Sequence, residues 1–160
     1  MAKEHAGKKS QVIATIFWAG LVCGILDITA AFVTWTLRGV SPLRLLQAIA
    51  SGLLGVAAYH GGWATATLGA ACHFFIAFSA ATVFSIASRK LPFLTRRPIL
   101  SGSSFGIAVY MVMYWIVMPL SRLQPMPFSL SRTAIAILTH MFCVGLPISL
   151  IVRRCSEPSV

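Results

Sequence analysis

The chain has 160 residues, of which 58% are hydrophobic and 10% are charged, and its mean hydropathy is +0.84. Soluble domains carry about 25% charged residues, so this composition excludes an ordinary soluble domain. The net charge of +10 would suit a nucleic-acid-binding protein, but the positions of the basic residues favour a different explanation.

Four stretches are long and apolar enough to cross a lipid bilayer, because about 20 apolar residues span its hydrocarbon core. They cover about residues 11–37, 65–88, 100–120 and 133–152. Only helices and closed barrels satisfy the backbone in lipid, and runs of this length exclude strands. We therefore predict a single transmembrane domain over residues 1–160. Its fold is an all-α four-helix bundle, and its expected partner is the lipid bilayer that surrounds it.

The segment between the first two spans is too apolar for a simple connector. Ser41 followed by Pro42 is typical of a helix start, with serine as the cap and proline in the first turn. Apolar residues then recur at helical spacing, with Arg44, Gln47 and Ser51 between them. This pattern predicts a short amphipathic helix over about residues 42–56, either lying on the outer membrane surface or re-entering the bilayer.

The basic residues fall mainly on one side of the membrane if the four helices alternate in direction. Nine of the 13 lie before the first span, between the second and third, or after the fourth: Lys3, Lys8, Lys9, Arg89, Lys90, Arg96, Arg97, Arg153 and Arg154. The opposite side holds Arg38, Arg44, Arg122 and Arg132. The positive-inside rule then predicts that both termini are cytoplasmic. Topology explains the charge, so we expect no nucleic-acid partner.

Asp27 is the most informative residue, because it is one of only three acidic residues and lies inside the first apolar stretch. A charged side chain at the centre of a membrane helix costs about 2.5–3.5 kcal/mol on insertion scales. A partner, a bound ion or protonation must therefore offset this cost. Such a residue is a candidate functional site by default.

Small residues predict how the helices pack, because they let membrane helices approach closely. Gly20 and Gly24 form such a pair in the first span, and Gly102 and Gly106 form another in the third. In the fourth span, the sequence Gly145-Leu-Pro147 predicts a kink.

Polar residues fall on the same predicted packing faces. Asp27 follows Gly24 by three residues, His73 lies on the alanine-rich face of the second span, Tyr114 follows Gly106 by eight, and His140 follows Ala136 by four. Counting about 1.5 Å per residue places all four within about 5 Å of their span midpoints, on the outer side. We predict that Asp27, His73, His140 and Tyr114 meet in one polar layer inside the bundle.

Such a layer supports several kinds of chemistry. A buried acid beside histidines can relay protons or couple them to transport, because histidine titrates near neutral pH. Two histidines on facing helices can also ligate haem iron, and His73, His140 and Cys143 are a weaker donor set for a metal ion. A quinone-binding redox module and a non-catalytic membrane subunit or assembly partner remain alternatives. The proton- or ion-coupled role is the leading hypothesis, without a resident cofactor.

The sequence shows no phosphate-binding loop and no nucleophile elbow, so we do not expect an enzyme. Four helices of this length enclose little volume, and a transporter built from them is expected to form a homo-oligomer.

The residues His73-Phe-Phe-Ile-Ala-Phe78, Pro119-Leu120, and His140 with Arg153-Arg154 resemble those of small bacterial inner-membrane proteins of the YagU type. The resemblance covers about the last 90 residues. It implies a bacterial plasma-membrane location and no defined chemistry.

Overall fold

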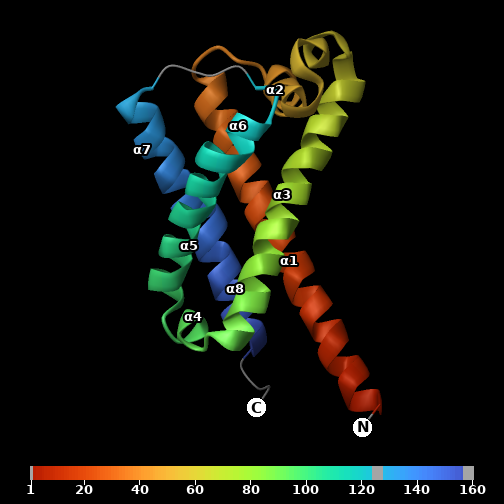
Figure 1. The fold of residues 1–160 in the computed structure, drawn as a ribbon, viewed down its shortest axis with the longest axis vertical. Coiled ribbons are helices and arrows are strands. Elements are labelled where there is room, and N and C mark those ends of the chain that lie inside the picture. Colours follow the sequence, from red (N-terminus) through yellow and green to blue (C-terminus); the bar gives the residue numbers. More distant parts are fainter. Residues whose placement is uncertain (1, 124–127, 157–160) are drawn as a thin grey trace.

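The computed structural model describes residues 2–123 and 128–156, and every element in these two ranges is helical. Both chain ends and the short helix α4 lie at one end of the molecule, which we call the termini end; α2 and α6 lie at the opposite end, the α2 end (Figure 1). The elements are α1 (Ala2–Thr36), α2 (Pro42–Leu54), η1 (Gly55–His60), α3 (Gly62–Lys90), α4 (Phe93–Arg96), α5 (Pro98–Val112), η2 (Met113–Val117), α6 (Met118–Leu120), α7 (Leu130–Thr139), η3 (His140–Gly145) and α8 (Leu146–Ser156). The all-α prediction is confirmed.

Five helical segments of the described chain, rather than four, are long and apolar enough to cross a membrane: Ser10–Thr36, Pro42–His60, Gly62–Lys90, Pro98–Leu120 and Leu130–Cys155. Four of them contain the predicted spans. The additional segment arises because the chain continues past α2 as the 3₁₀ helix η1, which extends the apolar helical stretch to 19 residues. By length and composition alone, the prediction of four spans is therefore one too few.

The start of α2 is as predicted, since the Ser41 hydroxyl accepts a hydrogen bond from the backbone N–H of Arg44 at 3.3 Å. The polar residues of this helix do not share one exposed face. Arg44 is exposed, whereas Gln47 is buried and donates to the carbonyl of Gly62 at 3.1 Å. The side of α2 that carries Gln47 packs against α3, and Leu53 is exposed.

Glycines set the close approach of α1 to α3. A Cβ atom at Gly24 would lie 2.7 Å from the Phe74 ring and 3.3 Å from the Cβ of Ala77, and one at Gly20 would collide with the Phe78 ring. The predicted packing role of this glycine pair is confirmed. It brings the segment of α1 just before Asp27 directly against α3.

The backbones of α5 and η3 approach even more closely. A Cβ at Gly106 would lie 2.6 Å from the Cα of Met141, and one at Gly145 would lie 2.5 Å from the backbone nitrogen of Gly106. Gly102 packs against Ser149, whose hydroxyl donates to the carbonyl of Pro98 at 2.8 Å. The segments Pro98–Leu120 and Leu130–Cys155 are thus joined by backbone contact.

The predicted kink at Gly145-Leu-Pro147 takes the form of a π-helical stretch, η3, which ends two residues before Pro147. A second π-helical stretch, η2, ends two residues before Pro119. Proline lacks an N–H and its ring crowds the preceding turn, and widened π turns are one way that a helix absorbs this defect. Both π stretches lie beside the candidate site described below.

The contact between α5 and η3 can be tested with two Gly→Ala substitutions. Gly106→Ala should lower the free energy of unfolding by about 1–3 kcal/mol, as overpacking does, because the new methyl group meets backbone atoms. Gly52→Ala in α2 is the matched control: its Cβ would have ordinary contacts of 3.6 Å or more, so it should be neutral or stabilise by about 0.5–1 kcal/mol. Unfolding followed by circular dichroism in detergent measures both, and equal effects would contradict this packing.

Candidate functional site

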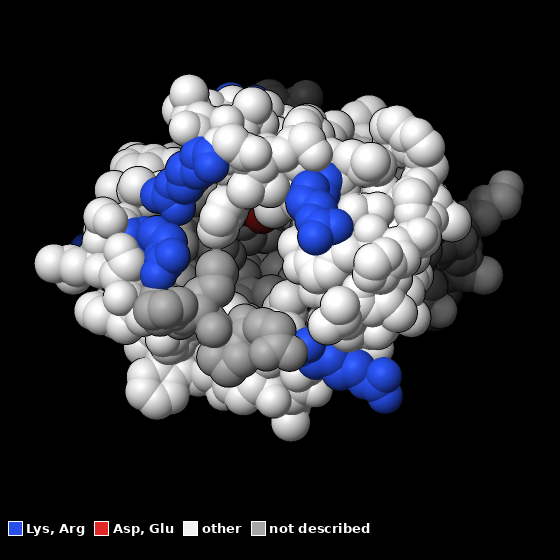
Figure 2. Space-filling view, turned by 90° about the horizontal axis from the view of Figure 1, so that it is seen from above, with Lys and Arg blue, Asp and Glu red and all other residues white. Residues whose placement is uncertain are grey.

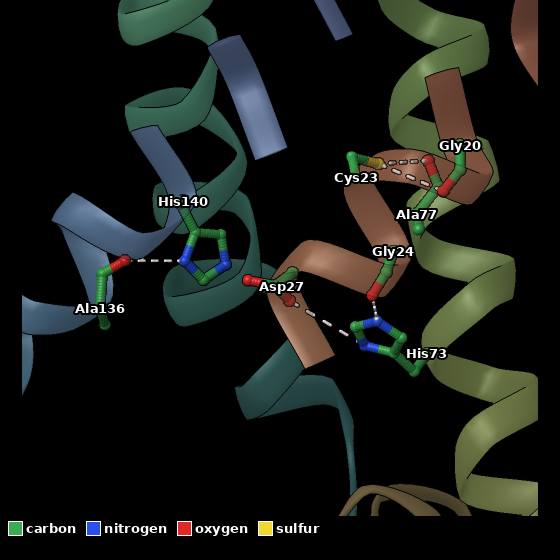
Figure 3. A network of polar contacts seen from close by, with 8 residues as sticks. All are labelled: Gly20, Cys23, Gly24, Asp27, His73, Ala77, Ala136 and His140. Carbon is green, nitrogen blue, oxygen red and sulfur yellow. Dashed lines mark hydrogen bonds and ion pairs between the residues drawn. The ribbon is translucent and has the colours of Figure 1, made fainter. Parts of the chain in front are cut away.

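Asp27 lies on α1 one turn beyond Gly24, where α1 is flanked by α3 on one side and η3 on the other. Its side chain is 20% exposed. Figure 3 shows its carboxylate between two imidazole rings, His73 on one side and His140 on the other, with one oxygen directed toward each ring. The structure therefore brings together three of the four residues that the sequence placed in one layer.

His73 is held by the backbone of α1. Its Nε2 lies 2.9 Å from the carbonyl oxygen of Gly24, and because a carbonyl only accepts hydrogen bonds, Nε2 must carry a proton. Its Nδ1 lies 4.0 Å from the Oδ2 of Asp27. In a neutral imidazole with Nε2 protonated, Nδ1 is an acceptor, so an ionised carboxylate would face a lone pair. A proton on either Nδ1 or the carboxylate removes this conflict.

His140 is held in the same way with its two nitrogens exchanged. Its Nδ1 lies 2.8 Å from the carbonyl oxygen of Ala136, so Nδ1 carries the proton and donates. The other nitrogen, Nε2, is on the side of the ring nearer Asp27 (Figure 3). Each histidine thus donates to a backbone carbonyl through one nitrogen and turns the other toward Asp27. We call His73, Asp27 and His140 the Asp/His row.

Two cavities meet at this row. The larger, which we call the vestibule, has a volume of about 270 Å³ and lies between α1, α5–α6 and α7. The smaller, the inner pocket, has a volume of about 120 Å³ and includes His73 on its wall. Asp27 and His140 border both cavities. The row therefore forms part of the wall that the two cavities share.

The vestibule opens at the α2 end. Viewed from that end, the molecule is hollowed, with acidic atoms at the bottom of the hollow and basic side chains around it (Figure 2). The wall includes Arg38 and Arg132, and Asp27 is the acid that borders the cavity. The rest of the vestibule wall is mainly apolar or aromatic and includes Trp35, Tyr110, Tyr114, Met118, Phe128 and Ile135.

Tyr114 lies on the vestibule wall rather than in the row. Its ring stacks on Tyr110 at a centroid distance of 5.9 Å, and it is Tyr110 that packs edge-on against His140, at 5.7 Å. Counting from the middle of the predicted span placed Tyr114 one turn too close to the row. Tyr110 lies on the same helix face, so the face was predictable and the depth was not.

The donors do not gather as a metal site. Among the described residues, no group of three or more His, Cys, Asp or Glu side chains is placed to hold a metal ion, which argues against the weaker alternative of His73, His140 and Cys143. A haem iron between the two histidines does not fit either, because the Asp27 carboxylate occupies the space between the rings (Figure 3).

Three vestibule residues had no role in the sequence-based site: Trp35, Arg38 and Arg132. The guanidinium of Arg38 lies 5.4 Å from the centre of the Trp35 ring, which fixes both side chains at the cavity wall. The sequence analysis placed the two arginines on the less basic side of the membrane and gave them no role in the site. Only the position of α7 shows that these residues share a cavity with Asp27.

The contact between Asp27 and His73 predicts an energetic coupling that a double-mutant cycle can measure. His73→Gln keeps an amide N–H near the Nε2 position for the Gly24 carbonyl but removes the nitrogen that faces Asp27. Combined with Asp27→Asn, it should give a coupling free energy of about 0.5–3 kcal/mol in unfolding experiments in mixed micelles. His60→Gln, on exposed η1, is the control and should show no coupling to Asp27→Asn. Equal coupling free energies for His73→Gln and His60→Gln with Asp27→Asn would contradict the contact.

No protein-family profile, curated protein or solved structure matches this chain. The function therefore has to be argued from the site itself.

Proposed function

We propose that this chain is a multi-pass membrane protein in which the Asp/His row holds and exchanges protons in a transport or relay role. The observation that carries the proposal is the arrangement of the row: both histidines are anchored through one nitrogen to a backbone carbonyl and face Asp27 with the other. The bacterial plasma membrane, as implied by the YagU-type resemblance, is the proposed location.

The distribution of side chains supports membrane insertion. Large apolar residues are exposed along all the long helices, including Phe17, Phe75, Ile99 and Leu138. In water this surface would be an aggregation hazard, whereas in lipid it needs no cover. The basic residues around α4 and in the last turn of α8 lie at the termini end (Figure 1), so the positive-inside rule supports a cytoplasmic termini end.

We propose four spans, with Pro42–His60 re-entering the membrane from the α2 end rather than crossing it. The α-helical part of this segment has 13 residues and is about 20 Å long, against a hydrocarbon core of about 30 Å. It ends at Gly55, whose φ of +63° breaks the helix. The outward leucines and the buried Gln47 fit a helix that faces lipid while its polar side packs on α3.

The proton argument follows from charge. With both anchored nitrogens protonated, an ionised Asp27 and two neutral histidines leave only acceptors facing one another. One added proton, on the carboxylate or on a facing ring nitrogen, removes one of these repulsions. A histidine titrates near physiological pH, so the row is suited to gain and lose this proton. Asp27 and His140 both border the vestibule, which would give this proton access to the α2 end.

The alternative of a purely structural membrane subunit differs in one measurable property, the exchange of the proton. Homo-oligomerisation remains a prediction. One chain lines the whole vestibule, so the cavity does not require a second copy. Crosslinking in native membranes will determine the oligomeric state.

The topology can be tested by labelling single cysteines, in a background with the native cysteines replaced, with a membrane-impermeant maleimide. Leu37→Cys and His60→Cys flank the disputed segment and are both exposed. If the segment re-enters, both should be labelled from outside intact cells and Phe93→Cys, beside α4, should not. Labelling at Leu37→Cys without labelling at His60→Cys would instead show that Pro42–His60 crosses the membrane.

Proton exchange can be tested by infrared difference spectroscopy on protein purified in detergent. The chain has three acidic residues, so a Glu4→Gln/Glu157→Gln background leaves Asp27 as its one acidic side chain. Stepping the pH between about 5 and 8, where histidine titrates, should change the carboxyl or imidazole bands of the row. Asp27→Asn should abolish the carboxyl signal and alter the imidazole signal, with little change in thermal stability.

The control is His60→Gln, which should leave the signals of the row intact. Spectra that show no change dependent on Asp27 over this range would contradict proton exchange and favour the structural role.

A further inference from the structure

The vestibule has a charge pattern that the proton proposal does not use. Arg38 and Arg132 are on its wall, and Arg44 and Arg122 belong to the same end of the molecule. The sequence has no acidic residue between Asp27 and Glu157, so Asp27 is the only acid near this end. A cavity whose mouth carries mainly one sign of charge concentrates ions of the opposite sign, and here the arginines outnumber the one acid, Asp27, on the wall. The approach to the vestibule therefore favours anions over cations.

The wall selects for a ligand with an apolar body. Trp35, Tyr110, Tyr114 and Phe128 supply aromatic surface, and Arg38 is held over the Trp35 ring. Ligand pockets are typically about 300–1,000 Å³ and mostly apolar with a few placed polar groups. At about 270 Å³, the vestibule is slightly smaller than this range. It suits a single ring or a short branched chain.

We propose that the vestibule binds a small organic anion with an apolar body, its charged group near Arg38 and Arg132, and that binding is linked to the proton of the Asp/His row. This inference rests on the proposed function and names the ligand class of the same site. The aromatic residues contact the body of the ligand, and the row forms the floor beneath it.

The sign of the linkage follows from the charge of the floor. With one proton shared between Asp27 and His73, the pair has no net charge; without it, the pair carries a charge of −1 and repels the anion. Protonation thus favours binding, and by reciprocity the bound anion favours protonation. Binding should weaken as the pH rises.

Other groups that face Asp27 contribute to this balance. They are Cys23 on α1, His73 on α3, Tyr110 and Tyr114 on α5 and η2, His140 and Cys143 on η3, and the rim residues Arg38 and Arg132. Among them, only the arginines are cationic throughout the physiological pH range, and only Asp27 and the histidines have side chains whose ordinary titration lies below or near neutral pH. The pH dependence should therefore be that of the row.

The test uses three probes with the same ring: benzoate, neutral benzamide and benzylammonium. Their binding to full-length protein in nanodiscs of zwitterionic phosphatidylcholine is measured by tryptophan fluorescence and saturation-transfer NMR. Benzoate should bind most tightly at about pH 5.5 and weaken by about fivefold or more toward about pH 8. Benzamide should show no such dependence.

Substitutions separate the two parts of the inference. Arg38→Gln/Arg132→Gln should weaken benzoate binding by about tenfold, as expected for loss of a charge-assisted contact, and leave benzamide unchanged. Arg44→Gln is the matched control, since Arg44 lies over Tyr59 and does not line the vestibule. Asp27→Asn should hold benzoate binding at its low-pH strength at every pH.

Tighter binding of benzylammonium than of benzoate, or wild-type benzoate binding by Arg38→Gln/Arg132→Gln, would overturn the inference. Loss of benzoate binding in nanodiscs that contain phosphatidylglycerol would assign the anion site to a lipid headgroup and overturn it for soluble anions. An infrared signal that depends on Asp27 without benzoate binding refutes this inference alone. Arginine-dependent benzoate binding without that signal refutes the proton role and the linkage, and leaves the anion site.

Discussion

The structure depends on how α1 shields a carboxylate in the middle of an apolar helix. Gly20 and Gly24 let the aromatic side chains of α3 pack directly against α1, and this contact brings His73 close enough to donate to the Gly24 carbonyl. The same imidazole then faces Asp27. The packing residues and the polar residues are therefore parts of one interface, and the glycines on α1 matter to the site because they set its distance from α3.

The opposite side of the site depends on two prolines. The π-helical stretches η2 and η3 precede Pro119 and Pro147, and they carry Tyr114 and His140 respectively. Helix α7, which precedes η3 in the chain, lies at the edge of the bundle (Figure 1). It has no buried residue. The vestibule is the space left between α7 and α1. A continuous straight helix through this region would place α7 elsewhere and change that space.

Much of this could be predicted from the sequence, because apolar length and small-residue spacing determine which segments are helices and which faces pack. Asp27 and His73 were expected to meet for that reason. The position of the tyrosine along its helix was harder to predict. Tyr114 was expected beside the histidines, whereas Tyr110, one turn earlier, packs against His140. The surroundings of Gln47 on α2 could not be predicted, because amphipathic spacing does not say whether another helix or solvent covers a polar residue. The vestibule depends on long-range packing, so no local pattern of residues could predict Arg38 and Arg132 beside Asp27.

The two carbonyl contacts also limit how a proton can move through the row. His73 and His140 each hold one nitrogen against a backbone oxygen, so turning either ring over would break a hydrogen bond and leave a buried carbonyl without its donor. A proton is therefore expected to pass between the histidines through Asp27 rather than by rotation of a ring. The carboxylate faces one histidine nitrogen on each side. A single added proton can lie in only one of these two contacts at a time, so the other contact always lacks a proton. The proposed relay requires such a vacant contact, and the position of Asp27 between the two histidines would provide it.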